Sequence, residues 1–241
     1  MLEKKKLEEF TKINQTTFDN AVREYCQHLF LSYLYQKPES AKLFFKGGTA
    51  LRIIFGSPRF SEDLDFTGLN IGLKKIETMF AETLSDVEKT GIKVEISESK
   101  LTSGGYLGIA YFSLYNVKFP IQIEVSLRTK KRLLGERALV VNDYLTAYTL
   151  VHLKTEELIA EKLEALFDRQ KPRDFYDYYY LLSGNYPVVK DKKNLKKVLD
   201  LLKKKDINFK SELKKFLPAS QAMQLRDFKK ILKRKINNYL G

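Results

Sequence analysis

The chain is organised around the segment FFKGGTALR (residues 44–52), which continues after a short turn as RFSEDLDF (residues 59–66). Two adjacent glycines, Gly47 and Gly48, precede a run with helical spacing from Thr49 to Phe55. Glycine permits backbone conformations and close approaches that other residues do not, and the start of a helix favours negative charge. The segment therefore predicts a loop whose backbone amides can approach the phosphates of a nucleotide.

Two carboxylates follow the turn, at Asp63 and Asp65. In a strand, alternate side chains share a face, so we expect both carboxylates on one face while Leu64 and Phe66 point into the core. Neighbouring carboxylates repel unless a cation lies between them, and such oxygen ligands suit Mg²⁺ whose shell is completed by phosphates. Each half of the motif alone is common as a turn or a solvated strand edge. Together, around a short helix, the two halves favour a site for a nucleotide and a metal.

Composition indicates a globular chain of one large domain or two small ones. Of the 241 residues, 44% are hydrophobic, which is enough for an ordinary core. The single cysteine, Cys26, excludes an internal disulfide framework, and we expect it in the core of a protein from the reducing cytoplasm. The N-terminal residues lack the apolar run of a signal peptide, and no apolar stretch reaches the ~18 residues that span a membrane. A soluble cytoplasmic protein is therefore expected.

The net charge of +13 is concentrated at one end of the chain. From Pro187 to Gly241 there are 17 lysines and arginines against 5 acidic residues, whereas the rest of the chain is nearly neutral. Such a charge favours a polyanionic partner, with nucleic acid first and an anionic membrane surface second, although lysine-rich helices are also simply well solvated. The clusters that could bind RNA phosphates are Lys203, Lys204 and Lys205, and further on Lys229, Lys230 and Lys233.

Hydrophobic spacing divides the chain into two regions. Residues 1–145 combine helices with strands, and residues 146–241 are expected to be helical, strongly basic from about 187. The first region is predicted to hold helices at 8–36 and 74–89 and strands at 94–97, 107–115, 121–127 and 138–141. The second region is predicted to turn helical at Tyr148, with lysine-rich helical segments at 192–204, 208–217 and 221–240. The fold class is therefore α+β, followed by an all-helical domain.

A third carboxylate and several cations could complete the site. Glu124 lies in the strand 121–127, on the face away from the aliphatic residues; beside the Asp63–Asp65 strand it would join the carboxylates, and elsewhere it would face solvent. A glycine turn and a group of carboxylates match what nucleotidyl transfer needs, and this reaction further requires cations that balance the charge of the triphosphate. Asp174 could orient one of these cations or assist proton transfer. Among the cations we favour Lys162, because apolar neighbours would bury its stem; the candidates are Lys46, Arg59, Lys162, Arg169 and Arg173.

Two motifs resemble the signatures of a known family. KGGTAL (46–51) with RFSEDLDF (59–66), and EKLEALFDR (161–169) with RDFYD (173–177), are similar to those of the AbiEii/AbiGii-type nucleotidyltransferase toxins, which include the mycobacterial MenT toxins. The resemblance covers roughly residues 40–185. It implies a polymerase-β-like minimal nucleotidyltransferase core with a small mixed sheet, flanking helices and a helical domain after it.

The resemblance also implies roles for individual residues. Asp63 and Asp65 would hold one or two Mg²⁺ ions, with Glu124 at the position of the third acid, where the family more often has aspartate. Lys162 would contact phosphates, and Asp174 would join Asp63, Asp65 and Lys162 among the catalytic residues. The residues that would bind the NTP are Lys46, Gly47, Gly48, Thr49, Arg59 and Ser61.

The resulting functional prediction is a Mg²⁺-dependent toxin that transfers a nucleotide from NTP to RNA, first of all to tRNA 3′ ends, and thereby blocks translation. Its partners would be the NTP, the RNA acceptor and a cognate antitoxin protein. The alternatives are a transferase that modifies a protein side chain, and a fold that binds RNA without catalysis. RNA binding without catalysis would not require two carboxylates placed side by side. A membrane-surface role would need a free apolar helix face beside the basic one.

Overall fold

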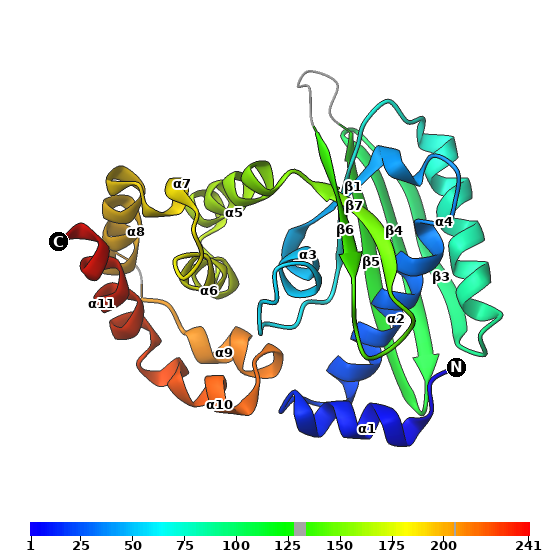
Figure 1. Cartoon of the computed structure of the whole chain (residues 1–241), viewed down its shortest axis with the longest axis horizontal. Helices are drawn as coiled ribbons and strands as arrows, with labels where there is room; N and C mark the ends of the chain where they lie inside the picture. The colour runs from blue at the N-terminus through cyan, green and yellow to red at the C-terminus, as the bar shows by residue number, and fades with distance from the viewer. Residues whose placement is uncertain (128–133, 205) are drawn as a thin grey trace. The chain divides into compact units, whose positions relative to one another are not determined.

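The computed structural model describes residues 1–127, 134–204 and 206–241, so Lys205 lies outside the described residues. The chain divides into two compact units, which we call the sheet unit and the helical unit (Figure 1). The sheet unit comprises Met1–Gly56 and Phe60–Lys154. The helical unit comprises Thr155–Gly241 together with Ser57–Arg59, the turn inside the glycine and aspartate motif. The C-terminal unit thus begins at Thr155 and not at residue 146.

The sheet unit is built on a mixed sheet with the strand order β3-β4-β5-β2-β1-β7-β6. β2 pairs antiparallel with β1 and parallel with β5, and β1 pairs parallel with β7. The expected mixed sheet with flanking helices is therefore confirmed. Its strands are β1 (Leu43–Lys46), β2 (Leu64–Gly68), β3 (Lys93–Thr102), β4 (Gly105–Leu114), β5 (Val117–Leu127), β6 (Gly135–Val140) and β7 (Tyr148–Leu153).

Helices cover the sheet and bury its apolar side chains. Leu64 and Phe66 of β2 are fully buried, as the alternation predicts. The ring of Phe80 on α4 lies 5.9 Å from that of Phe66 and 5.7 Å from that of Phe30 on α2. Figure 1 shows α4 running along β3 and β4. The helices are α1 (Lys4–Ile13), α2 (Phe18–Leu34), α3 (Gly47–Ile53) and α4 (Leu73–Glu88).

Two predictions about this unit are wrong. The helix expected over 8–36 is two helices, because Gln15 has a positive φ of 49° and the Thr17 side chain caps α2 by accepting the Asn20 amide at 3.3 Å. The segment that was expected to turn helical at Tyr148 is strand β7, which pairs with β1 and β6. The phenol of Tyr148 lies 2.8 Å from Nδ1 of buried His28, whose pKa burial lowers to about 4.

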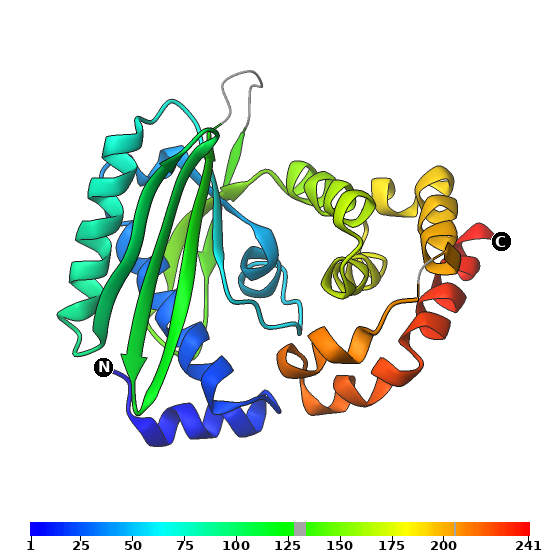
Figure 2. The same cartoon turned by 180° about the vertical axis from the view of Figure 1, so that it is seen from behind.

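The helical unit is held together by an aromatic core. The ring of Phe209 lies 5.9 Å from that of Phe175 and 4.9 Å from that of Phe228, and Tyr176 stacks on Phe228 at 5.7 Å. The helix predicted at 192–204 is confirmed (Figure 2). The segment predicted at 208–217 is α9 followed by a 3₁₀ turn, and the segment predicted at 221–240 is divided at Asp227, after which α11 begins. The helices are α5 (Thr155–Arg169), α6 (Pro172–Leu181), α7 (Pro187–Lys190), α8 (Lys192–Lys204), α9 (Phe209–Leu213), α10 (Ala219–Ala222) and α11 (Phe228–Leu240).

The amphipathic helices of this unit use their apolar faces internally. Leu195, Val198 and Leu202 of α8 are fully buried, and Leu232 and Ile236 of α11 are fully buried as well. No helix in the described ranges is both long enough and apolar enough to cross a bilayer. Neither α8 nor α11 therefore presents the apolar face that a membrane-surface role would need.

Candidate active site

The glycine segment turns the chain tightly from β1 into α3. Gly47 has a φ of +82°, a conformation that L side chains rarely adopt. A Cβ at Gly47 would also overlap the carboxylate of Asp65 and would lie only 2.9 Å from the Asp65 Cβ. The position thus requires glycine for two reasons, and the Gly47 backbone lies directly against the side chain of Asp65.

Thr49 joins α3 to the start of β2. Its side chain is almost fully buried, and its hydroxyl donates a hydrogen bond to the Asp63 carbonyl oxygen. Asp63 itself precedes the strand, which begins at Leu64. The Thr49 hydroxyl therefore fixes the spacing between the two halves of the motif, while its predicted contact with a triphosphate remains a prediction.

A row of three charged residues crosses the neighbouring strands β1, β2 and β5. Lys46 is the register partner of Asp65, and Asp65 is the register partner of Glu124. Register partners share a face of the sheet, so Glu124 lies beside Asp65, which is one of the two placements that the sequence left open. The Lys46 ammonium also donates to the Ser126 hydroxyl at 3.0 Å. We call Lys46, Asp65 and Glu124 the charged row.

The donor set fits Mg²⁺ with bound substrate. Within the described residues, no group of three or more His, Cys, Asp or Glu side chains is arranged to hold a metal ion on its own. Mg²⁺ is commonly held by one or two carboxylates, with water and substrate phosphates filling the remaining positions. Asp63 and Asp65 can supply that number of ligands, and Glu124 lies one strand away from Asp65.

Helix α2 holds both halves of the motif, which the sequence did not reveal. Buried Gln27 donates two hydrogen bonds from its amide nitrogen, each 3.0 Å long, to the carbonyl oxygens of Ser61 and Glu62. One turn earlier, Glu24 accepts from Arg52 of α3 at 2.6 Å and from the Tyr144 hydroxyl at 2.8 Å. A single helix thus fixes α3 and the approach to Asp63. The backbone of Ser61, expected to bind the NTP, is held by Gln27.

We expect Gln27→Leu to lower kcat about 10- to 100-fold, because small displacements of positioned groups have effects of this size. The two freed carbonyl oxygens should also lower the free energy of unfolding by about 1–3 kcal/mol. Steady-state transfer at several Mg²⁺ concentrations, together with urea unfolding, would measure both effects. Exposed Gln36→Leu is the matched control. An unchanged kcat in folded Gln27→Leu protein would contradict the positioning role.

In the helical unit, Asp177 binds two of the cations that the sequence predicts for the triphosphate. Arg59 donates to both of its carboxylate oxygens, at 2.8 and 3.0 Å, and Lys162 donates to one of them at 2.8 Å. Asp177 and Arg59 are almost completely buried. Burial alone would raise the pKa of Asp177, but the nearby charges of Arg59 and Lys162 lower it to about 2. We call these residues the Asp177 triad.

Asp174 has a different environment on the same helix. It accepts from Arg169 at 2.8 Å and from the Lys171 backbone amide at 3.1 Å, at the start of α6. The Asp174 carboxylate is buried, whereas the Arg169 side chain is 50% exposed, so solvent reaches this pair from the Arg169 side. Asp174 thus pairs with Arg169, one of the candidate cations, while its role in the reaction stays a prediction. Arg173 pairs with Glu212 at 3.4 Å.

The structure therefore gathers the predicted residues into two groups on different units. The sheet unit holds Asp63, Thr49 and the charged row, and the helical unit holds Asp174 and the Asp177 triad. The missed residues are Glu24, Gln27 and Asp177. Of these only Asp177 carried a sequence signal, because it falls one turn after Asp174 in the motif RDFYD.

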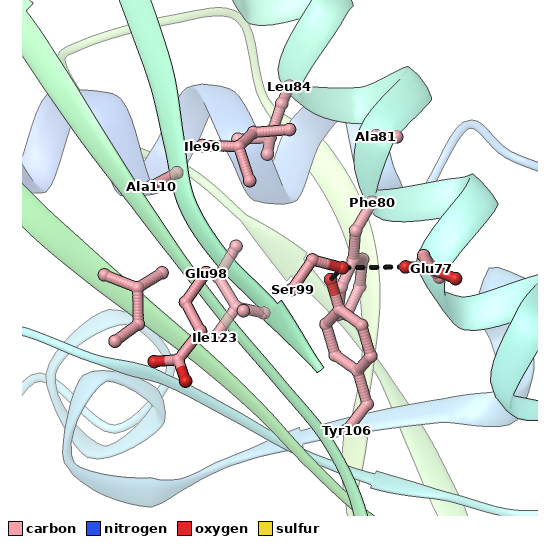
Figure 3. A pocket seen from close by; sticks show the side chains of 12 residues that line it. Glu77, Phe80, Ala81, Leu84, Ile96, Glu98, Ser99, Tyr106, Ala110 and Ile123 are labelled. Carbon is pink, nitrogen blue, oxygen red and sulfur yellow. Dashed lines mark hydrogen bonds between the residues drawn. The ribbon is translucent and has the colours of Figure 1, made fainter. Parts of the chain in front are cut away.

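A separate hollow of about 190 Å³ lies between α4 and strands β3 and β4 (Figure 3). Its lining is mostly apolar, and the Ser99 hydroxyl lies 2.8 Å from a Glu77 carboxylate oxygen and 3.0 Å from the Tyr106 hydroxyl. Ile123 lines the hollow, whereas its neighbour Glu124 belongs to the charged row. Adjacent strand residues face opposite sides of a sheet, so the hollow and the charged row are on opposite faces.

Comparison with known families agrees with this geometry. Residues 29–241 match the family model described as "Nucleotidyl transferase AbiEii toxin, Type IV TA system". The chain belongs to the AbiEii family. It is therefore a nucleotidyltransferase of a family of toxins from type IV toxin–antitoxin systems. No curated protein sequence gave a significant match.

Two solved structures share the fold of this AbiEii protein. JHP933 from Helicobacter pylori is similar with a TM-score of 0.54 and 19% identity, over 92% of this chain and 95% of that one. A proposed nucleotidyltransferase from H. pylori gives a TM-score of 0.53 and 20% identity, over 90% of this chain and 95% of that one. At these identities the likeness establishes the fold, and the functional assignment depends on the family.

Proposed function

We propose that this AbiEii protein transfers a nucleotide from NTP to an RNA acceptor in a Mg²⁺-dependent reaction. The observation that carries the proposal is the charged row, because Lys46, Asp65 and Glu124 are in register across three strands and Asp65 lies against Gly47. A cation next to carboxylates, beside a glycine turn, is the combination that a metal-bound triphosphate requires.

In this mechanism Asp63 and Asp65 hold Mg²⁺, and Glu124 assists as a further acid. The metal would neutralise charge that develops on the transferred phosphorus group. Gly47 and Gly48 leave room for the triphosphate, and Lys46 offsets its charge. On the helical unit, Lys162 binds phosphate with the ammonium hydrogens that Asp177 leaves available, and Asp174 keeps the role of a catalytic-site residue.

For the acceptor we favour RNA, and tRNA 3′ ends in particular, because the helical unit carries most of the excess positive charge of the chain. Modification of tRNA ends would block translation and would explain the toxin role. The reaction takes place in the cytoplasm, where tRNA and NTP are found. A cognate antitoxin, which the type IV system implies, would oppose this effect.

A transfer assay tests this proposal. The purified protein is incubated with Mg²⁺, total tRNA and each α-³²P-labelled NTP in turn, with and without EDTA. We expect label in tRNA for one preferred NTP, and none when EDTA is present. Label on a protein acceptor would favour the side-chain-modifying alternative. Absence of label with every NTP, together with absence of NTP binding, would overturn the proposal.

A further inference from the structure

The exposed face of α8 is almost entirely cationic. Its outward side chains are six lysines and one acid, whereas its inward side chains are aliphatic and buried. Lys192 and Lys203 are eleven residues apart, so the lysines extend over about 16 Å of helix. We call this surface the α8 lysine face; it comprises Lys192, Lys193, Lys196, Lys197, Lys203 and Lys204.

We propose that the α8 lysine face binds the sugar–phosphate backbone of a duplex stem in the acceptor RNA. This inference rests on the RNA acceptor of the proposed function and adds where the acceptor is held. The charged side chains are available for it. In the described part of the chain, no carboxylate pairs with Lys192, Lys193, Lys196 or Lys204.

The charges of α8 oppose its own stability as a helix. Lys192 and Lys193 lie in the first turn, which contains no acidic residue, and cations there interact unfavourably with the helix dipole. Lys196 and Lys197 follow them at a spacing of four, which brings like charges together on the helix surface. Asp191 caps the helix through the Lys193 amide at 2.9 Å but does not pair with either lysine side chain. A charge that costs folding stability is better explained by a polyanionic partner than by solvation.

The structure favours a duplex over the other polyanions. The apolar face of α8 is buried, with Leu195 and Leu202 fully inaccessible, so it cannot insert into a lipid surface. Single-stranded RNA is usually bound by exposed aromatic rings on which bases stack. One aromatic ring beside this face, that of Phe167, is covered by the Lys197 ammonium at 3.7 Å. Backbone contact without base stacking is typical of duplex recognition.

Helix α11 is the competing surface, since Lys229, Lys230 and Lys233 were predicted from the sequence to bind RNA. Several of its cations are engaged within the unit. Lys230 pairs with Asp227 at 3.5 Å, and Lys235 donates to the Tyr179 carbonyl oxygen at 3.1 Å. For this reason α8 is the stronger candidate.

The test measures binding of a fluorescent 12-base-pair RNA hairpin by anisotropy over a range of salt concentrations, without NTP. Three full-chain variants are compared, each with four positive charges replaced by glutamine. The α8 variant changes Lys192, Lys193, Lys196 and Lys204; the α11 variant changes Lys229, Lys230, Lys233 and Arg234; and the control changes the exposed Lys5, Lys12, Lys74 and Lys75 of the sheet unit.

We expect the α8 variant to reduce the slope of log K against log salt by about three to four, since each phosphate contact contributes about 0.9. The control should change the slope by less than about one, and the melting temperature of the α8 variant should be no lower than that of the wild type.

A smaller slope in the α11 variant alone, or equal slopes in all variants, would show that RNA binds but not at the α8 lysine face. Binding of anionic vesicles in place of the hairpin would overturn the α8 inference in favour of a membrane. If the wild type does not bind RNA but still transfers label to another acceptor, the α8 inference is wrong while the proposal of nucleotidyl transfer stands.

Discussion

Replacing Asp65 with alanine is expected to abolish nucleotidyl transfer, by at least about 10³-fold in kcat, because it removes a carboxylate from the centre of the charged row. Asp65 has Lys46 and Glu124 as its register partners, and Glu124, the other carboxylate of the row, lies one strand further from Lys46. The half-buried side chain contributes little to folding, and we expect the free energy of unfolding to change by no more than about 1 kcal/mol. Transfer of labelled NTP and urea unfolding would measure the two effects.

A matched carboxylate on the same sheet gives the control for this experiment. Glu98 of β3 is half-buried and pairs with Lys100, as Asp65 neighbours Lys46, but it lies at the edge of the sheet. Glu98→Ala should therefore transfer nucleotides at the wild-type rate. Folded Asp65→Ala protein with wild-type activity would show that the metal is held elsewhere.

The fold could be predicted where the pattern is local. The alternation from Ile121 to Leu127 and the amphipathic spacing of 192–204 correspond to β5 and α8. The segment Tyr148–Leu153 was misread because its apolar residues run into those of α5, and it becomes a strand only by pairing with β1 and β6. The break before α2 depended on the Thr17 cap and the left-handed Gln15, which apolar spacing does not report.

The candidate site was predictable to the extent that its residues adjoin one another in the sequence. Gly47, Asp63 and Asp65 lie within one motif. Strand alternation placed Glu124 on the polar face of its strand, but its position beside Asp65 depends on the pairing of β5 with β2, which the sequence left open. Gln27 and Asp177 were missed because their partners are distant in the sequence. Gln27 reaches a carbonyl 34 residues away, and Asp177 binds Arg59 across 118 residues.

Asp177→Asn is expected to lower the free energy of unfolding by about 3–5 kcal/mol, because it leaves buried Arg59 and half-buried Lys162 without a counter-charge. Asparagine has the same shape, so the loss reports charge and not packing. The carboxylate has a pKa of about 2 in the folded chain against 3.8 ordinarily. A carboxylate whose pKa is lowered in the folded state stabilises that state at pH values above its ordinary pKa. This stabilisation is lost as the pH falls towards the folded-state pKa. The difference between wild type and variant in urea unfolding should therefore shrink between about pH 4 and pH 2.

Asp174→Asn, three residues earlier on α6, separates a structural carboxylate from a proposed catalytic one. Its partner Arg169 is half-exposed and can be solvated when the pair is broken, so we expect a loss of only about 1–2 kcal/mol. Because Asp174 is proposed to act in the reaction, transfer should nevertheless fail in this folded variant. If Asp177→Asn unfolds at the wild-type urea concentration, the Asp177 triad does not stabilise the helical unit. Full activity in Asp174→Asn would leave Lys162 as the functional residue of that unit.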